Sequence, residues 1–317
     1  MKKKFGKLLF VPVLGLLAFA ISCNNATDPN APAGVYGCMD PQATNYNTRA
    51  TVDDNSCLYA TTSEQSANAV IELYTGVRAI HGPEAQVLAQ NIQTSNPNNI
   101  IIVNIHTGSY AIPKTGWPDY TSAFGQALAD TAGLNQPLSD YPGGSVNRYN
   151  FMDVPTVVGL KMVPGASYTV LYKAGFLPAA NYFTAKITPV NIGLATYWTA
   201  STRKLKVLVE LYYKSAETVP NYLNVALLEN GLVGKQLRLT DTVPDYVQDH
   251  VLRTFLTGQW GDLITGTTGG VRIKKTYEFT VPAGYTIENC DVAAYVSEEV
   301  NGRKMNILTG KQKKAKI

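Results

Sequence analysis

The spacing of apolar residues changes along this chain, and that change constrains the fold most. In the first half, short apolar runs at 69–74 and 100–105 alternate with two helix-like segments. One helix is predicted to begin at Pro83 and the other to span 119–132. The continuous β-branched run at 100–105 is typical of a strand buried on both faces. Strands and helices in alternation predict a parallel sheet.

Beyond about residue 160, apolar and polar residues alternate instead. Within 205–211 every odd position is apolar, which marks one buried face of a strand. The spacing of the apolar runs suits an antiparallel β-sandwich, interrupted by one helical piece at 245–256. Further strands are predicted at 185–194, 223–229, 271–281 and 292–296. We therefore expect an α/β domain over 66–160 and an all-β sandwich over 161–310.

The N-terminus has the features of a secretion signal. Four lysines precede an apolar run from Leu8 to Ile21, which is shorter than the roughly 20 residues that span a membrane. Residues 20–23, Ala-Ile-Ser-Cys, resemble the lipobox of bacterial lipoproteins, with Ala20 where leucine is usual. The alternative is an ordinary signal peptide and a coincidental cysteine. We predict cleavage after residue 22, acylation of Cys23 and a flexible tether over 23–36.

The charge of the chain is concentrated at its ends. The formal charge of +4 includes four lysines of segment 1–22, which has no acidic residue, so the remaining chain is close to 4 − 4 = 0. A Lys-rich tail at 311–317 is predicted to be a solvated, frayed end. Because the body of the chain shows no basic stripe, the sequence excludes nucleic acid as a partner. The predicted contact with a membrane comes through the lipid anchor.

Residues 37–58 form a loop-rich segment bounded by two cysteines. The segment resembles a short module that recurs in exported proteins of Gram-negative bacteria. A Cys38–Cys57 disulfide would constrain it by ~3 kcal/mol, since so short a piece cannot bury a core. Hard oxygen ligands for Ca²⁺ are offered by Asp40, Asp53 and Asp54. Their spacing differs from that of an EF-hand, and we favour the alternative that these side chains form Asx turns.

Several stretches resemble a known family. They are E-x-Y-T-G at 72–76, an apolar strand ending in His106, Y-P-x-G-x-V-N-R at 141–148, and a second cluster at 246–261. Together, over about residues 69–310, they resemble the Omp-twenty-eight-related outer membrane protein family. This resemblance implies an outer-membrane location. It also implies that the α/β domain is thioredoxin-like.

The resemblance also shows what this chain lacks. Many family members carry C-x-x-C-P shortly after the T-G pair, and the two cysteine positions correspond here to Ala79 and Gly82, ahead of Pro83. Thiol–disulfide exchange requires a thiolate. We therefore expect a thioredoxin-like fold without redox activity. The remaining Cys290 lies far along the chain and is expected to be a small buried residue.

A binding surface could remain where the redox site is lost. By the resemblance, Tyr141 and Pro142 occupy the place of the cis-proline loop, which in thioredoxins pairs with an extended peptide. Arg78 and His81 would complete the rim of the vacated site. A peptide-binding role for these four residues is one hypothesis. The alternative is that they border an unused surface.

Other chemistry has little support in the sequence. The three histidines have no zinc-ligand spacing, so no metal site is predicted. Asp249 and His250 are adjacent, and neighbours on the predicted helix would point apart, which favours a structural histidine. No motif of a serine hydrolase or a nucleotide-binding loop is present.

The sequence therefore predicts a non-enzymatic outer-membrane lipoprotein without a cofactor, which binds a protein or peptide partner at the cell envelope. The alternative is an accessory or chaperone-like relative of thiol–disulfide oxidoreductases whose redox activity is lost.

Overall fold

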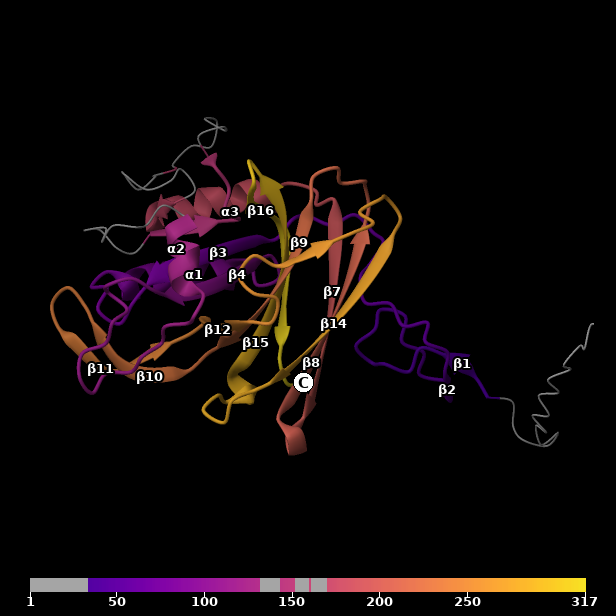
Figure 1. Ribbon diagram of the computed structural model, residues 1–317, viewed down its shortest axis with the longest axis horizontal. Helices are drawn as coiled ribbons and strands as arrows, with labels where there is room; N and C mark the ends of the chain where they lie inside the picture. The colour runs from indigo at the N-terminus through magenta and orange to yellow at the C-terminus, as the bar shows by residue number, and fades with distance from the viewer. Residues whose placement is uncertain (1–33, 132–142, 152–159, 161–169) are drawn as a thin grey trace, which may run out of the picture.

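The computed structural model describes residues 34–131, 143–151, 160 and 170–317. The predicted signal peptide, Cys23 and the Tyr141–Pro142 pair lie outside these residues. The described chain is rich in strands, and its elements form one nine-stranded sheet, one three-stranded sheet and two small two-stranded sheets (Figure 1). Among the described residues, no helix has both the length and the apolar character needed to cross a bilayer.

One half of the molecule combines helices with a sheet. Its elements are β3 (Ala69–Thr75), α1 (Gly82–Ser95), β4 (Ile100–His106), α2 (Gly125–Thr131), β5 (Gly143–Val146), β6 (Leu171–Tyr172) and α3 (Phe176–Thr184). β3 and β4 pair in parallel along their whole length, whereas β5 is antiparallel to β3 and to β6. Both predicted strands and the helix beginning at Pro83 are therefore confirmed.

The second helix is shorter than predicted. It begins at Gly125 rather than at residue 119. The Asp119 carboxylate accepts hydrogen bonds from the backbone N–H (2.8 Å) and the hydroxyl (2.7 Å) of Thr121, which holds this segment in an Asx turn. Thr121 also forms an isolated parallel bridge with His106 at the end of β4.

The other half is built from two layers of strands. One layer contains β7 (Val190–Thr199), β8 (Lys204–Tyr213) and β14 (Arg272–Thr280), in the order β14-β8-β7. The facing layer contains β9 (Asn221–Glu229), β13 (Asp262–Ile264), β15 (Cys290–Val300) and β16 (Arg303–Lys314). Val207, Val209 and Leu211 of β8 are buried in one apolar cluster with Val225 and Leu227 of β9. The alternation within 205–211 thus marks a buried face, as predicted.

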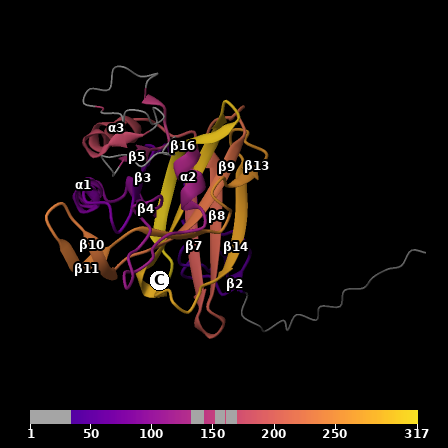
Figure 2. The same ribbon diagram turned by 60° about the vertical axis from the view of Figure 1, so that its left-hand side comes forward.

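The two halves share a single sheet. Its main path runs β16-β15-β9-β12-β4-β3-β5-β6, so strands from both predicted domains lie side by side (Figure 2). The connection is β12 (Val251–Phe255), which is antiparallel to β9 and meets β4 where Val251 stands opposite Asn104. The predicted boundary at residues 160–161 lies beside segments outside the described residues. β6 and α3, which follow it in sequence, pack with the α/β half.

The predicted helix at 245–256 is wrong. The segment contains the end of β11 (Thr242–Gln248) and all of β12, and β11 pairs with β10 (Leu232–Leu237) as an antiparallel hairpin. Between the strands, His250 has a φ of 55°, a left-handed conformation that interrupts the strand and excludes a continuous helix.

The predicted Lys-rich tail is solvated, since three of its four lysines are exposed, but the prediction that it is frayed is wrong. β16 continues to Lys314 and pairs with β15, and Ala315 is buried. Lys313 and Lys316 hydrogen-bond to Leu194 and Glu288, respectively. The tail is therefore part of the folded body, because its backbone completes the sheet.

The boundaries of the strand predicted at 185–194 are also shifted. The strand there, β7, begins at Val190 because α3 and its following turn occupy the residues before it.

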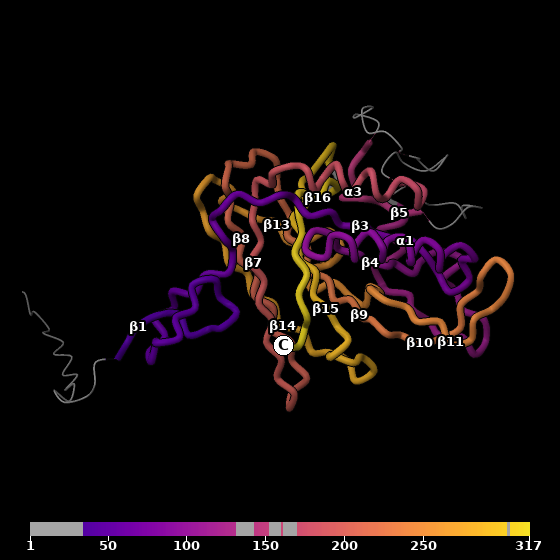
Figure 3. The backbone as a smooth tube through the Cα atoms, turned by 180° about the vertical axis from the view of Figure 1, so that it is seen from behind, coloured from indigo at the N-terminus to yellow at the C-terminus, as the bar shows by residue number. Residues whose placement is uncertain are grey.

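A small module projects from the strand-rich half. It contains the parallel pair β1 (Tyr36–Gly37) and β2 (Val52–Asp53) and the predicted Cys38–Cys57 disulfide. The views from the front and from behind place it at one end of the long axis, with α1 and the β10–β11 hairpin at the other (Figures 1 and 3).

Candidate binding groove

The loop between β3 and α1 lies beneath the β10–β11 hairpin. Gln236 of β10 donates from Nε2 to the carbonyl oxygens of Gly76 (3.3 Å) and Ala79 (3.1 Å). The backbone N–H of Leu237 donates to the carbonyl of Val77 over 2.8 Å. Ala79 and Gly82, which stand at the lost cysteine positions, are both buried. The position that the resemblance assigns to the redox cysteines is therefore covered by another part of the same chain.

A chain of amide side chains holds the hairpin in place. Gln248 of β11 donates to Gln236 Oε1 (2.7 Å) and accepts from Gln86 of α1 (2.8 Å). The Tyr246 hydroxyl donates to Gln86 Oε1 over 2.8 Å. Gln236 and Gln248 are buried, whereas most of the hairpin is exposed or half-buried. No sequence pattern predicts this arrangement, because glutamine in an alternating strand usually lies on the solvent face.

The edge of this contact forms an apolar groove. A cavity of about 730 Å³ lies between α1 and the hairpin. Val87 of α1 is 56% exposed and Leu239, between β10 and β11, is 63% exposed. The remaining apolar lining comes from Ile80, Pro83, Leu88 and Tyr246. Exposed aliphatic side chains gathered around a cavity are unusual on a solvated surface and indicate a contact surface.

The groove continues along α1 and changes character. A second cavity of about 290 Å³ shares Val87 and Tyr246 with the first, and a third of about 550 Å³ shares Gln90 and His250 with the second. The third cavity is lined largely by polar residues, among them three lysines of β16: Lys311, Lys313 and Lys314. Lys314 forms an ion pair with Asp291 (3.0 Å). The groove therefore runs from an apolar end to a basic end.

Charged side chains border the apolar end without filling it. Glu84 forms an ion pair with Lys173 and lies 3.7 Å from His81 Nδ1. The hydrogen bond from Lys173 lowers the pKa of the Glu84 carboxyl. Across the cavity, Arg238 donates twice to Asp241, each bond being 2.9 Å long. Because these charges are exposed and paired with each other, they leave the aliphatic lining available.

The structure describes two of the four predicted peptide-binding residues. Arg78 is half-buried, and its backbone N–H donates to Tyr110 over 2.9 Å. His81 precedes α1 and is also half-buried. Both belong to the loop that contributes Ile80 to the groove. Tyr141 and Pro142 lie outside the described residues. The groove residues on the hairpin were not anticipated from the sequence.

Two buried histidines lie near the groove. Burial lowers the pKa of His106 to about 4, so its imidazole is neutral at pH 7, and its ring packs edge-on against Tyr120 with centroids 5.4 Å apart. Burial also lowers the pKa of His250, whose Nε2 lies 3.0 Å from Gln90 Oε1. Asp249 instead accepts the backbone N–H of Gly231 over 2.8 Å. Asp249 and His250 thus serve different contacts and do not form a dyad.

The polar residues of the family motifs meet inside the molecule. Glu72 of β3 accepts two bonds from the Arg148 guanidinium, 2.8 Å and 2.5 Å long. Burial opposes the charge of Arg148, but the Glu72 carboxylate outweighs it and raises the pKa of the guanidinium. Asn147 accepts the N–H of Val70 (2.6 Å) and donates to the carbonyl of Ile307 (2.8 Å) in β16. These residues connect β3, β5 and β16 and do not line the groove.

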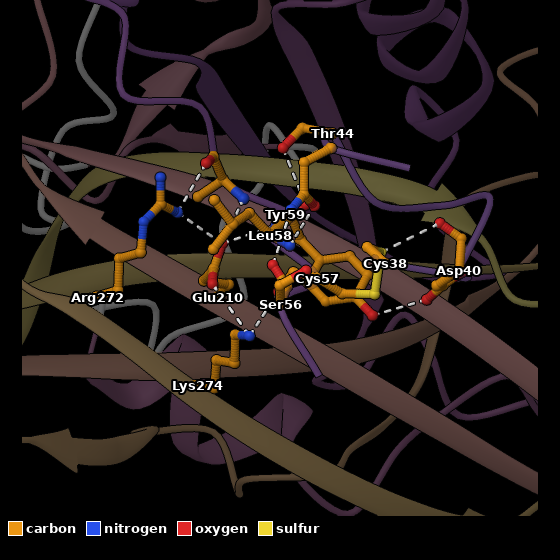
Figure 4. Close-up of polar contacts among 12 residues, drawn as sticks. Cys38, Asp40, Thr44, Ser56, Cys57, Leu58, Tyr59, Glu210, Arg272 and Lys274 are labelled. Atoms are coloured by element: carbon orange, nitrogen blue, oxygen red, sulfur yellow. Dashed lines mark hydrogen bonds and ion pairs between the residues drawn. A yellow bond between two sulfur atoms is a disulfide. The ribbon is translucent and has the colours of Figure 1, made fainter. Parts of the chain in front are cut away.

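The disulfide-bonded module is attached to the strand-rich half by polar contacts (Figure 4). Glu210, a buried residue of β8, accepts the backbone N–H groups of Tyr59 (2.7 Å) and Ala60 (2.8 Å). Arg272 of β14 lies 2.8 Å from the same carboxylate, and Lys274 lies 3.6 Å from it. Gly193 of β7 permits this approach, because a Cβ there would lie 2.1 Å from the carbonyl carbon of Tyr59.

The acidic residues proposed as calcium ligands hold the module's own turns. Asp53 accepts the N–H of Asn55 (3.1 Å), and Asp54 accepts the N–H of Ser56 (3.0 Å). Asp40 accepts the N–H of Gln42 (2.9 Å) and the hydroxyls of Tyr59 and Tyr197. These are the contacts that the Asx-turn interpretation predicts. Across the described ranges, no group of three or more His, Cys, Asp or Glu side chains is placed to hold a metal ion.

Comparison with known proteins gives one family and one shared fold. The family described as outer membrane protein Omp28 matches residues 173–316. HBP35 of Porphyromonas gingivalis has a similar structure, with a TM-score of 0.58 at 15% identity, over 79% of this chain and 76% of that one. This likeness indicates a shared fold. No curated protein matches the chain.

Two further structures are more distant. A domain of the outer membrane lipoprotein Omp28 from Porphyromonas gingivalis has 19% identity and a TM-score of 0.29, over 41% of this chain and 89% of that one. A protein of Agrobacterium tumefaciens has 11% identity and a TM-score of 0.48, over 80% and 96% of the two chains.

Proposed function

We propose, for a chain that is Omp28-related in its C-terminal half, that it is an outer-membrane lipoprotein and binds a segment of another envelope protein in the α1–hairpin groove. The single observation that carries the binding role is the exposure of Val87 and Leu239 around an apolar cavity. An apolar segment in this groove would remove both side chains from water. The family name and the neighbouring Omp28 lipoprotein support the outer-membrane location.

The anchor and the groove are compatible with each other in this proposal. The predicted acylated Cys23 precedes the module, which lies at the end of the long axis opposite to α1 and the hairpin (Figures 1 and 3). A protein held by its N-terminus would therefore present the groove away from the bilayer. That orientation favours a partner in the aqueous space over a partner within the membrane.

The role is proposed to be non-enzymatic. Ala79 and Gly82 carry no sulfur, and the hairpin covers their position. Burial raises the pKa of the Cys290 thiol to about 12, so this cysteine stays protonated and unreactive at pH 7. An insulin-reduction assay is expected to show no turnover, and measurable turnover would contradict this part of the proposal.

We also propose that the α/β half is thioredoxin-like in its topology. Support comes from the element order β-α-β-α-β-β-α and the strand order β4-β3-β5-β6, with β3 and β4 parallel and β5 antiparallel. In this view the β10–β11 hairpin lies where a thioredoxin would meet its substrate. Partner binding would then have moved to the adjacent groove.

Site-specific crosslinking tests the binding role. A photoreactive residue at position 87, in the groove, should give a defined protein adduct on intact cells. The same residue at Val219, an exposed valine on the strand-rich half, should not. After the adduct is identified, Val87→Asp with Leu239→Asp should weaken binding of the purified partner at least about tenfold, since a charge must be desolvated in an apolar site. If binding of the partner is unchanged by the two groove substitutions but lost with Val219→Asp, the groove is excluded as the binding site.

A further inference from the structure

The small module exposes an unusual share of apolar side chains. Of the fifteen large apolar residues that are exposed in the described chain, five lie within residues 35–52. Tyr36 is the most exposed of the five, at 68%, and it stands opposite Val52 in the β1–β2 pair. The five residues, here called the module face, are Val35, Tyr36, Met39, Tyr46 and Val52.

The packing of the module does not account for this face. The module's own apolar cluster consists of Cys38, Ala43 and Cys57, with Tyr59 packed against it. The body is contacted through other residues, chiefly Tyr59, Asp40 and Gln42, the last exchanging hydrogen bonds of 2.8 Å and 3.1 Å with the backbone of Thr196. β1 and β2 project beyond the body at the end of the molecule (Figures 1 and 3).

We infer that the module face rests on the headgroup region of the membrane that holds the lipid anchor. This inference relies on the proposed acylation of Cys23. The eleven residue-to-residue steps from Cys23 to Gly34 can span at most roughly 40 Å, which keeps the module close to the bilayer surface. Tyrosine suits that depth because its ring is apolar and its hydroxyl finds polar partners.

The charge of the module favours one kind of membrane surface. Between residues 34 and 60 the chain carries Asp40, Asp53 and Asp54 against one basic residue, Arg49. An acidic module is repelled by an anionic lipid surface, whereas a zwitterionic surface leaves apolar contact as the main attraction. The partner that fits is therefore a zwitterionic phospholipid surface, such as one rich in phosphatidylethanolamine.

The attachment of the module gives this contact a structural consequence. Glu210 and the hydrogen bonds between Gln42 and Thr196 hold the module in one orientation relative to the β-layers. A lipid anchor alone leaves a protein free to tilt. A second contact through the module face would fix the long axis away from the bilayer and keep the groove at the distal end.

Fluorescence quenching tests the contact in the full mature protein. Tyr36→Trp is compared with Leu239→Trp, a residue of similar exposure at the opposite end, after reconstitution into phosphatidylethanolamine–phosphatidylcholine vesicles with brominated acyl chains. The wild-type protein supplies the background of the three native tryptophans. We expect the emission added at position 36 to fall by about half or more, and that added at 239 to be unchanged. Equal quenching at both positions, or none at 36, would overturn the inference.

Two further measurements separate the possible outcomes. Mass spectrometry of the same sample shows whether Cys23 is acylated, so failure of the anchor and failure of the face are distinguishable. For the Cys23→Ser chain, replacing Tyr36 and Val52 by serine should reduce vesicle binding about tenfold. Replacing Val219 and Val233 by serine should leave it unchanged. A face that mediates contact between two copies would give concentration-dependent dimers without quenching, and that result would contradict the inference.

Discussion

The strand-rich half is joined to its two neighbours in different ways. It meets the α/β half through a continuous sheet, a shared apolar cluster, and hydrogen bonds between the buried Glu72–Arg148 pair and the Tyr295 hydroxyl of β15. It meets the module through backbone contacts to one buried carboxylate, Glu210, and a few side-chain hydrogen bonds. The shared sheet makes the two halves one cooperative body. The contacts through Glu210 attach the module, which has its own disulfide, as a separate unit.

The two buried glutamates at these joints, Glu72 and Glu210, therefore have different roles. Glu72 neutralises a single arginine deep inside the body, so its loss affects packing on every side. Glu210 faces the module and accepts N–H groups that would otherwise be buried without partners. Replacing each residue should therefore affect different parts of the molecule.

The largest effect is expected at the joint between the halves. Arg148→Ala leaves the Glu72 carboxylate buried without its partner, which should cost about 3–5 kcal/mol of the free energy of unfolding. Urea unfolding followed by circular dichroism measures this loss, and it should remain one cooperative transition. The matched control, Glu72→Gln with Arg148→Met, removes both charges and should recover much of the stability. A loss below about 1 kcal/mol in the single variant would show that the pair is not a structural joint.

Acid should weaken the body before it releases the module. The pKa of His106 is about 4 in the folded protein and 6.5 as its ordinary value, so the unfolded chain binds the proton more readily. Stability is therefore fully present above pH 6.5 and falls as the pH drops toward 4, by about 3 kcal/mol. Urea unfolding at a series of pH values checks this, with His106→Phe as the control in which the slope should flatten.

The module should stay attached over that pH range. Burial alone would raise the pKa of the Asp40 carboxyl, but its hydrogen bonds with Tyr197 and Tyr59 more than offset burial and lower the pKa below 3.8. The Asp40 carboxyl therefore takes up its proton at lower pH than an ordinary aspartate, and its contact should be among the last lost on acidification. Detachment of the module above pH 5, seen as increased amide exchange of residues 37–58, would contradict the comparison.

The smallest effect is expected at the module joint. Glu210→Gln removes the charge that receives two backbone N–H groups and faces Arg272, which should cost about 1–3 kcal/mol. The loss should appear as faster proteolysis and amide exchange in residues 37–61, with the urea midpoint of the body nearly unchanged. Glu278→Gln, at an exposed ion pair on the same sheet, serves as the control. Unfolding of the whole body in Glu210→Gln would show that the two joints are alike.

Local patterns were sufficient where one element's own residues decide its structure. The run at 100–105, the helix beginning at Pro83 and the alternation at 205–211 were predicted because burial on two faces, a capping proline and a two-residue period are all visible in sequence. The Cys38–Cys57 disulfide was predicted from a short motif between close cysteines. The helix predicted at 245–256 was wrong because Val247, Val251 and Phe255 also fit a helical period.

The candidate groove was not visible in the same way, because it depends on contacts between distant residues. Gln236 reaches a loop about 160 positions earlier, and Glu210 binds backbone 151 and 150 positions earlier. No local pattern fixes which strand faces which loop. That choice follows from how the two halves share one sheet.

The sequence by itself predicted an exported N-terminus and, by the resemblance, a chain without the two redox cysteines. It also indicated the disulfide-bonded module and the change from an α/β to a strand-rich pattern. Only the tertiary structure decided that the hairpin covers the loop between β3 and α1, that β16 includes the lysine-rich end, and that Glu72 meets Arg148. The physical reason is that composition and period record how each residue prefers to be solvated. Pairing between strands far apart in sequence is selected by the packing of the whole molecule.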